Sequence, residues 1–164
     1  MKHPNEALLE QFYSAFQQRD ASAMAACYHP TAAQFSDPVF TDLRDWQIGA
    51  MWQMLCERGT DLEISFSDIV ADSTQGSARW EAKYTFTATG RTVHNIIRAT
   101  FTFEDGHITA HQDTFKLWRW SRMALGVRGL LMGWMPPVQA TIRRQAATSL
   151  ERYIEKHSLD PSTD

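Results

Sequence analysis

Apolar residues in the first sixty positions recur with the period of a helix, and they predict three helices. The first begins at Asn5, whose side chain can cap it. Its apolar stripe consists of Leu8, Leu9, Phe12, Tyr13 and Phe16. A second, short helix is expected from Asp20 to Tyr28, and His29-Pro30 ends it because the residue before proline avoids the helical region. A third helix is expected over roughly 45–58, with Gly59 as its stop.

After Gly59 the apolar pattern changes to an alternation with a period of two. We expect antiparallel strands over 62–67, 78–87, 93–103 and 107–118, preceded by a short extended piece at 32–36. The alternation is clearest in the second strand, where one face consists of Ala78, Trp80, Ala82, Tyr84 and Phe86. Each strand has one apolar and one polar face, as in a sheet that covers a core on one side.

The remaining chain follows neither pattern closely. Residues 119–137 are rich in glycine, leucine and tryptophan, and Pro137 opens a final helix over 138–157. The order of helices, strands and tail predicts an α+β fold in a single domain, 1–164, with the helices packed against one face of the sheet. We interpret 119–137 as a lid over a pocket or a dimer contact, and a lipid-facing patch is the alternative.

Composition and charge narrow the class of protein. The chain has 164 residues and a formal net charge of -3, so it lacks the basic field typical of nucleic-acid binders. No apolar run approaches the ~20 residues of a membrane span, and 1–5 has no signal-peptide character. Cys27 and Cys56 lack the spacing of a metal or redox motif. We expect a cytoplasmic protein with no bound metal and no nucleic-acid partner.

The strand pattern places a histidine and an aspartate among aromatic residues. If Trp80 faces inward, Phe101 does too, and on the last strand so do His111, Asp113 and Phe115, or else their neighbours. A carboxylate among apolar side chains suits general acid or base catalysis near neutral pH, so Asp113 and His111 are candidate catalytic residues. The alternative is that Asp113 only accepts hydrogen bonds at the rim of the sheet.

Asp37 is the second candidate carboxylate, because it stands in the Asp37-Pro38 turn that follows the short extended piece. Such a turn can also be purely structural, since aspartate accepts hydrogen bonds from the amides that follow it. The chain contains no Gly-rich phosphate loop, nucleophile elbow or paired-histidine metal motif. The other histidines fall in termini, turns or the polar face, where we expect them to be solvated: His3, His29, His94, His107 and His157.

Three segments carry a family resemblance. Tyr28-His29-Pro30-Thr31-Ala32 leads to Ser36-Asp37-Pro38, and the last strand reads Asp105-Gly106-His107-Ile108 followed by His111-Gln112-Asp113. In this order of elements the chain resembles the nuclear transport factor 2-like superfamily, and in particular its SnoaL-like polyketide cyclases and ketosteroid isomerase-like members. The resemblance covers roughly 5–118 and leaves the tail outside it.

The resemblance implies a cone in which a strongly bent antiparallel or mixed sheet wraps three helices around a deep apolar cavity, usually in a homodimer. It implies that Asp113 acts as acid or base on an enolisable ligand, with His111 beside it. Asp37 would correspond to the proton-abstracting aspartate of steroid isomerases. The two oxyanion donors of those isomerases are missing, because their positions carry Phe12 and Ala99.

The resemblance also implies what an epoxide hydrolase of this superfamily would need, an inward arginine and aspartate opposite another aspartate. The corresponding strand offers Asn95, Ile97 and Ala99, so this chemistry is weakly supported.

We therefore expect a protein that binds a small, largely apolar molecule, polycyclic or aromatic, in the cavity. If it is catalytic, the expected reaction is proton transfer next to a carbonyl without a cofactor, in an isomerase, cyclase or dehydratase that uses Asp113. The alternative is a non-catalytic ligand-binding or protein-interaction module of the same fold. The side chains expected to contact the ligand are Phe12, Phe16, Trp52, Trp80, Tyr84, Phe101 and Phe115.

Overall fold

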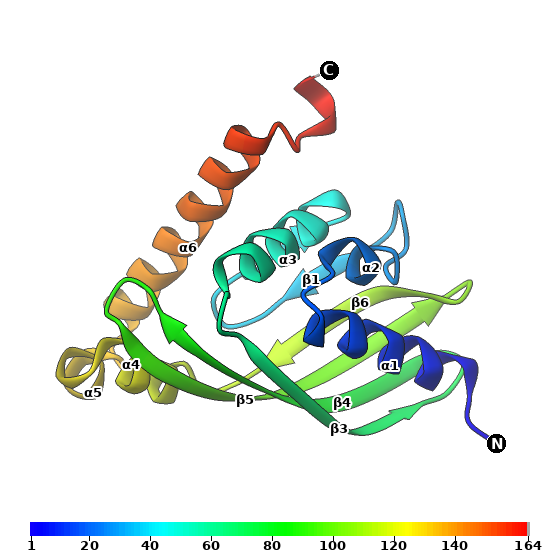
Figure 1. Ribbon diagram of the computed structural model, residues 1–164, viewed down its shortest axis with the longest axis horizontal. Helices are drawn as coiled ribbons and strands as arrows, with labels where there is room; N and C mark the ends of the chain where they lie inside the picture. The colour runs from blue at the N-terminus through cyan, green and yellow to red at the C-terminus, as the bar shows by residue number, and fades with distance from the viewer. Residues whose placement is uncertain (164) are drawn as a thin grey trace.

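The computed structural model describes residues 1–163, which form an α+β cone with a helical tail (Figure 1). In chain order its elements are α1 (Pro4–Gln17), α2 (Ala21–Ala25), β1 (Gln34–Ser36), β2 (Leu43–Arg44), α3 (Trp46–Arg58), β3 (Glu63–Ala71), β4 (Gln75–Phe86), β5 (Arg91–Glu104), β6 (His107–Thr114), α4 (Leu117–Leu125), α5 (Val127–Met132), α6 (Pro136–His157) and the 3-10 turn η1 (Pro161–Thr163).

The six strands form one mixed sheet in the order β2-β1-β6-β5-β4-β3. All neighbouring strands are antiparallel except β1 and β6, which run parallel with Phe35 opposite His111. The long strands β3 to β6 are strongly curved, and α1, α2 and α3 lie on their concave side (Figure 1). The predicted α+β cone, with three helices held by a bent sheet, is confirmed.

The starts of the first two helices follow from their capping residues. The prediction that Asn5 caps α1 is wrong, because His3 takes that position and Pro4 occupies the first turn, where no amide donor is needed. The Asn5 side chain instead donates to the carbonyl oxygen of Asp72, 2.8 Å away, and so ties α1 to the end of β3. Asp20 caps α2 as predicted, since its Oδ1 accepts from the amide of Ala23.

The last strand ends four residues before the predicted Trp118. β6 stops at Thr114, and Leu117 begins α4, so the tail that the alternation suggested as strand is helical. α4 turns into α5 at Gly126, which has a φ of 67°, a conformation that favours glycine. α5 then lies so close to α4 that a Cβ on Gly129 would be 1.9 Å from the Ser121 carbonyl oxygen.

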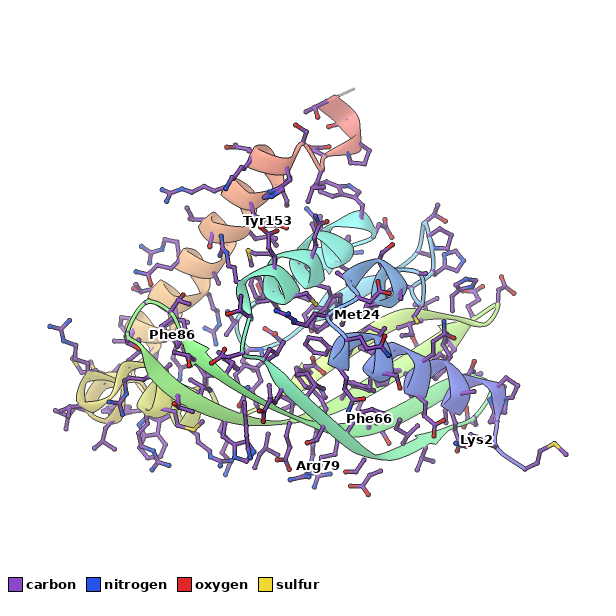
Figure 2. All side chains as sticks on the ribbon, viewed as in Figure 1. Lys2, Met24, Phe66, Arg79, Phe86 and Tyr153 are labelled. Carbon is purple, nitrogen blue, oxygen red and sulfur yellow. The ribbon has the colours of Figure 1, made fainter. Side chains whose placement is uncertain are left out.

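The concave side of the sheet holds the main core, and α4 closes one end of it. The main core fills the space between α1, α2, α3 and the sheet, and α6 adds Leu150 and Tyr153 to it. A second cluster joins α4 to β4 and β5, with Val93, Leu117 and Trp120 at its centre. Figure 2 shows Phe66 on the side of α1 and Arg79 on the opposite, convex side of the sheet.

The convex side of the sheet carries a group of charged side chains on β4 and β5. Arg79 pairs with Glu81 along β4 at 2.7 Å, and Glu81 pairs across the sheet with His94 at 2.6 Å. These partly exposed contacts fit a solvated outer face.

Across residues 1–163, every helix is too short or too polar to cross a bilayer.

Candidate functional site

The site is built around two side chains of β6 that point into the cone. Strand register places Asp113 opposite Ala99 and His111 opposite Phe101 on β5. His111 is 2% exposed and Asp113 is 3% exposed, whereas Gln112 between them is exposed. The inward parity predicted from the aromatic pattern is therefore confirmed. A histidine and an aspartate share one face because side chains of a strand alternate between its two sides.

A chain of hydrogen bonds runs through this pair from α3 to β4. Trp52 Nε1 donates to the Tyr28 hydroxyl at 3.1 Å, and that hydroxyl lies 2.7 Å from Nδ1 of His111. His111 Nε2 lies 2.9 Å from Asp113 Oδ1, which also receives the indole proton of Trp80 at 3.2 Å. Four side chains, from α3, the segment after α2, β4 and β6, are thus connected by hydrogen bonds to one oxygen of Asp113.

The partners assign the protons along this chain. In a neutral His111 ring whose Nε2 donates to Asp113, Nδ1 is an acceptor, so the Tyr28 hydroxyl donates to it while accepting from Trp52. Nε2 of His111 then carries the ring proton and donates it to Asp113 Oδ1. Burial raises the pKa of Tyr28 well above its ordinary value, and the nearby Asp113 charge adds to the rise. Tyr28 therefore stays protonated and fixes the histidine tautomer.

The two oxygens of Asp113 have different surroundings. Oδ1 accepts from His111 and Trp80, while Oδ2 receives no hydrogen bond from residues 1–163. Oδ2 is also absent from the fully enclosed unpaired polar atoms, a group whose single member within 1–163 is the hydroxyl of Tyr13. The carboxylate is therefore held by one oxygen and keeps the other for a further partner.

Tyr13 brings an unpaired hydroxyl to the same region. The residue is fully buried between Phe66, Trp80 and Phe101, and its hydroxyl has no partner within residues 1–163. Burial raises the pKa of Tyr13 well above its ordinary value, and the charge of Asp113 raises it further. A buried donor without an acceptor is costly, so this hydroxyl is suited to an acceptor on a bound molecule.

Asp37 lies in the turn after β1, within electrostatic reach of Asp113. Its Oδ1 accepts from the amides of Val39 at 2.7 Å and Phe40 at 2.6 Å, which is the structural role expected of an Asp-Pro turn. Burial, more than the nearby Asp113 charge, raises its pKa from 3.8 to about 7. Within 1–163 its Oδ2 receives no hydrogen bond. Asp37 can therefore both hold its turn and exchange a proton near neutral pH.

The side chains predicted to contact a ligand divide into two groups. The first group is almost completely buried and contacts His111 or Asp113 directly, or, for Phe16, through Trp52 and Trp80: Phe12, Phe16, Trp52, Trp80 and Phe101. The second group, Tyr84 and Phe115, is only partly buried and lies where the two cores meet, beneath α4. Trp120 of α4 donates to the Tyr84 hydroxyl at 2.8 Å, so the tail directly covers this second group.

The interior around His111 is filled by rings rather than open. The ring centroids of Phe12, Phe35 and Phe101 lie 5.7, 4.9 and 4.4 Å from that of His111. Two hollows of about 330 and 620 Å³ lie against α2 and α3; Tyr28 lines the larger one, but neither lining includes His111 or Asp113. The deep cavity expected around Asp113 stays a prediction.

No cluster of three or more histidine, cysteine, aspartate or glutamate side chains within 1–163 is arranged to hold a metal ion. Cys27 and Cys56 are buried free cysteines, and burial raises the pKa of each thiol to about 11. These thiols are therefore protonated and unsuited to nucleophilic attack.

Sequence reasoning did not place Tyr28 in this site, and it set Tyr13 aside because Tyr13 lies one residue from the isomerase donor position. Tyr28 stands 83 positions before His111, and the two meet because Tyr28 forms a parallel bridge with Ile108 of β6. A helix end and a strand edge give no local sign of such pairing. Tyr13 lies one position from Phe12, which occupies the place of an isomerase oxyanion donor, and both side chains are fully buried. Tyr13 therefore places a buried, unpaired hydroxyl one position away from Phe12.

A family model described as the SnoaL-like domain matches residues 9–111 of the chain. No curated protein matches the sequence of the chain.

Solved structures support the same fold. An epoxide hydrolase of limonene-epoxide-hydrolase type from M. tuberculosis aligns with a TM-score of 0.62 at 19% identity, over 78% of this chain and 92% of that one. A putative polyketide cyclase from Xanthomonas campestris pv. campestris gives 0.59 at 22% identity, over 73% and 96%. TerC, co-crystallized with polyporic acid, gives 0.62 at 15% identity, over 73% and 97%.

Proposed function

The chain belongs to the SnoaL-like domain family, and from this premise we propose that it binds a small, largely apolar carbonyl compound and moves a proton next to the carbonyl. Asp113 is the acid or base, His111 and Trp80 orient it, and Asp37 is a second carboxylate near the mouth of the cone. The reaction class is isomerisation, cyclisation or dehydration.

The observation that carries this proposal is the pair of polar groups left without a partner in an otherwise apolar interior. Asp113 Oδ2 accepts no hydrogen bond from residues 1–163, and the Tyr13 hydroxyl donates none. One group accepts a proton and the other donates a hydrogen bond, which are the two functions that enolisation of a ketone requires. The buried Tyr13 hydroxyl is costly in the free protein unless a bound molecule satisfies it.

The proposed step balances without a co-reactant. Asp113 Oδ2 takes the proton from the carbon next to the carbonyl, and the electron pair of that C–H bond moves into the enolate. The negative charge that develops on the carbonyl oxygen accepts a hydrogen bond from Tyr13. Return of the proton to another carbon completes an isomerisation, and attack of the enolate on a second carbonyl forms a ring. Asp37, with its pKa at about 7, can supply or take the accompanying proton.

Apolar rings around the site would select the ligand class. Phe12, Phe16, Trp52 and Phe101 present aromatic faces and edges, which favour a flat aromatic or polycyclic body. Among the similar structures, TerC was co-crystallized with polyporic acid, and two were described as putative polyketide cyclases. These relatives support a small-molecule ligand for this fold.

The second candidate function is ligand binding without chemistry. It is favoured by the aromatic rings around His111, which suit an apolar ligand whether or not a proton is transferred. Both functions predict a bound apolar molecule, and they differ in whether Asp113 transfers a proton. The expected homodimer and cytoplasmic location are part of the proposal and stand as predictions.

Native mass spectrometry of freshly purified protein tests the binding step. We expect an adduct of a few hundred daltons per chain, and we expect 2-tetralone, an enolisable aromatic ketone, to bind when added to the emptied protein. Phe101→Glu, which places a second carboxylate against His111, is the test variant, and Thr102→Glu on the exposed side of β5 is its matched control. Binding of 2-tetralone that survives Phe101→Glu unchanged would place the ligand outside the cone.

A further inference from the structure

The helical tail exposes an unusual group of large apolar side chains. Six of the nine large hydrophobic residues exposed within 1–163 fall between positions 118 and 134. They are Trp118 (37% exposed), Val127 (70%), Leu130 (44%), Leu131 (64%), Met132 (42%) and Trp134 (63%). We call this surface the α4–α5 face. Isolated exposed apolar residues are ordinary, whereas a contiguous group marks a contact surface.

Charged residues are also distributed unevenly along the chain, because residues 114–150 carry only positive ones. Residues 114–150 contain six lysine or arginine residues and no aspartate or glutamate. The whole chain has a net charge of -3, so the other residues together carry -9. The cations of the segment are Lys116, Arg119, Arg122, Arg128, Arg143 and Arg144. The apolar face thus belongs to a segment whose charged side chains are all cations, in a protein that is otherwise acidic.

The α4–α5 face is a built surface, with its side chains tied to the helices beneath them. Trp134 Nε1 donates to the carbonyl of Leu131 at 3.0 Å, and Trp118 Nε1 donates to the carbonyl of Leu130 at 3.2 Å. The Arg122 guanidinium lies 5.2 Å from the centre of the Trp118 ring. These contacts hold the two indoles at the surface.

We propose that the α4–α5 face binds the surface of an anionic lipid bilayer, with its apolar side chains in the interfacial layer and its arginines against the lipid phosphates. Tryptophan, leucine and arginine on one short helical surface are the residue types that interfacial anchoring uses. The described helices cannot cross a bilayer, so the contact is peripheral.

Charge argues against a second copy of the chain as the occupant. A twofold dimer would place this face against itself, because such an interface uses the same surface on both subunits. Arg122 and Arg128 would then meet the same cations of the partner, with no acid anywhere in 114–150 to neutralise them. A bilayer that contains anionic lipid supplies the missing negative charge.

The position of the face relates membrane contact to access to the cone. α4 packs on Tyr84, Phe86 and Phe115 at the end of the sheet that carries the β4–β5 turn, and Arg143 of α6 donates to the carbonyl of Pro38 at 2.9 Å. In Figure 1 α4 and α5 lie together at this end of the sheet. An apolar ligand that leaves the bilayer would therefore meet the part of the fold that covers the site.

Vesicle co-sedimentation of the full chain tests this inference. The vesicles contain about one part phosphatidylglycerol to two parts phosphatidylcholine, compared with phosphatidylcholine alone, at about 0.1 M salt. We expect binding to the anionic vesicles only. Since each cation near an anionic surface contributes about fivefold to binding, Arg128→Glu should weaken it by about tenfold or more. Leu131→Glu should weaken it at least as strongly.

Matched controls separate this face from general effects of charge. Val70→Glu changes an apolar residue that is 62% exposed on β3, and Arg152→Glu changes an exposed arginine outside 114–150. Both should bind anionic vesicles like the wild type. Equal binding to both kinds of vesicle, equal loss in Val70→Glu and Leu131→Glu, or no binding at all would overturn the proposal. So would a stable dimer that Leu131→Glu dissociates, because the face would then be a protein interface.

Discussion

Nε2 of His111 lies 2.9 Å from Oδ1 of Asp113, and neither side chain has more than 2% of its surface exposed. The pair connects the phenol of Tyr28 on one side to the indole of Trp80 on the other. Because every one of these groups is enclosed, each hydrogen bond replaces one that water would otherwise make. The pair therefore has to be complete for the interior to be stable.

Replacement of His111 by phenylalanine keeps a ring in the core but removes both of its hydrogen bonds. Asp113 and Tyr28 then each lose a buried partner, which should lower the free energy of unfolding by about 2 to 5 kcal/mol. Urea denaturation measures the change. His94→Phe breaks the partly exposed pair with Glu81 and should cost less than about 1 kcal/mol. Similar decreases in the free energy of unfolding of the two variants would show that the buried network stabilises the fold no more than an exposed ion pair.

The two buried tyrosines should respond in opposite ways to loss of their hydroxyls. In Tyr28→Phe, Trp52 loses its acceptor and His111 loses its donor, so stability should fall by about 1 to 3 kcal/mol. In Tyr13→Phe no hydrogen bond within 1–163 is lost, and stability should stay equal or rise. Thermal unfolding of both variants without ligand measures the two changes in stability. A large decrease in the stability of Tyr13→Phe would mean that the Tyr13 hydroxyl has a structural partner.

Asp37 should make stability depend on pH between about 4 and 7. Its pKa is about 7 in the folded chain and 3.8 without the fold, so folding favours the protonated form. Below pH 4 both states are protonated and the group has no effect. As pH rises toward 7 the unfolded state ionises first, so stability falls, by no more than about 4 kcal/mol, and this loss persists at higher pH.

Asp37→Asn isolates this contribution. The amide oxygen can still accept from Val39 and Phe40, but the group no longer titrates. The variant should match the wild type near pH 4 and be more stable than it at pH 8, as measured by urea unfolding at each pH. A difference between the two proteins that is the same at both pH values would show that Asp37 titrates normally.

The sequence predicted the fold more completely than the site, for physical reasons. Alternation alone placed His111 and Asp113 on the inner face, because the direction of a strand side chain depends on its parity. The short Gln34–Ser36 strand was expected as extended chain, but its parallel pairing with β6 was not. That pairing depends on contacts across more than seventy positions, and so does the contact between Tyr28 and His111.

Elements that end or begin without local signals were the least predictable. Thr114 ends β6, and the next apolar residues, Phe115 and Leu117, fit a continued strand as well as a helix start. The N-terminal cap went to His3 rather than Asn5 because a long-range bond to Asp72 takes the asparagine side chain. Local propensity did not decide either of these cases.

Gly129 should be indispensable for the docking of α5 onto α4. An added Cβ would lie 1.9 Å from the Ser121 carbonyl oxygen. This backbone atom cannot move away as the end of a flexible side chain could. Gly129→Ala should therefore lower the melting temperature and increase proteolysis within α5, while Gly90→Ala changes a turn glycine with open space around it. Because Gly90 has a φ of 69°, that control should cost only about 1 kcal/mol from backbone strain. Intact α5 in Gly129→Ala would contradict the packing.

The central claim, that Asp113 transfers a proton next to a carbonyl, is tested most directly by hydrogen exchange of 2-tetralone in deuterium oxide, followed by proton NMR. The account predicts that the wild type accelerates loss of the α-proton signal by about 10² to 10⁴-fold over buffer. Asp113→Asn should bind the ketone without accelerating exchange, while Glu63→Gln, an exposed carboxylate change on β3, should behave like the wild type. Exchange at the wild-type rate in Asp113→Asn, or bound ketone with no acceleration by the wild type, would contradict the claim and leave ligand binding as the function.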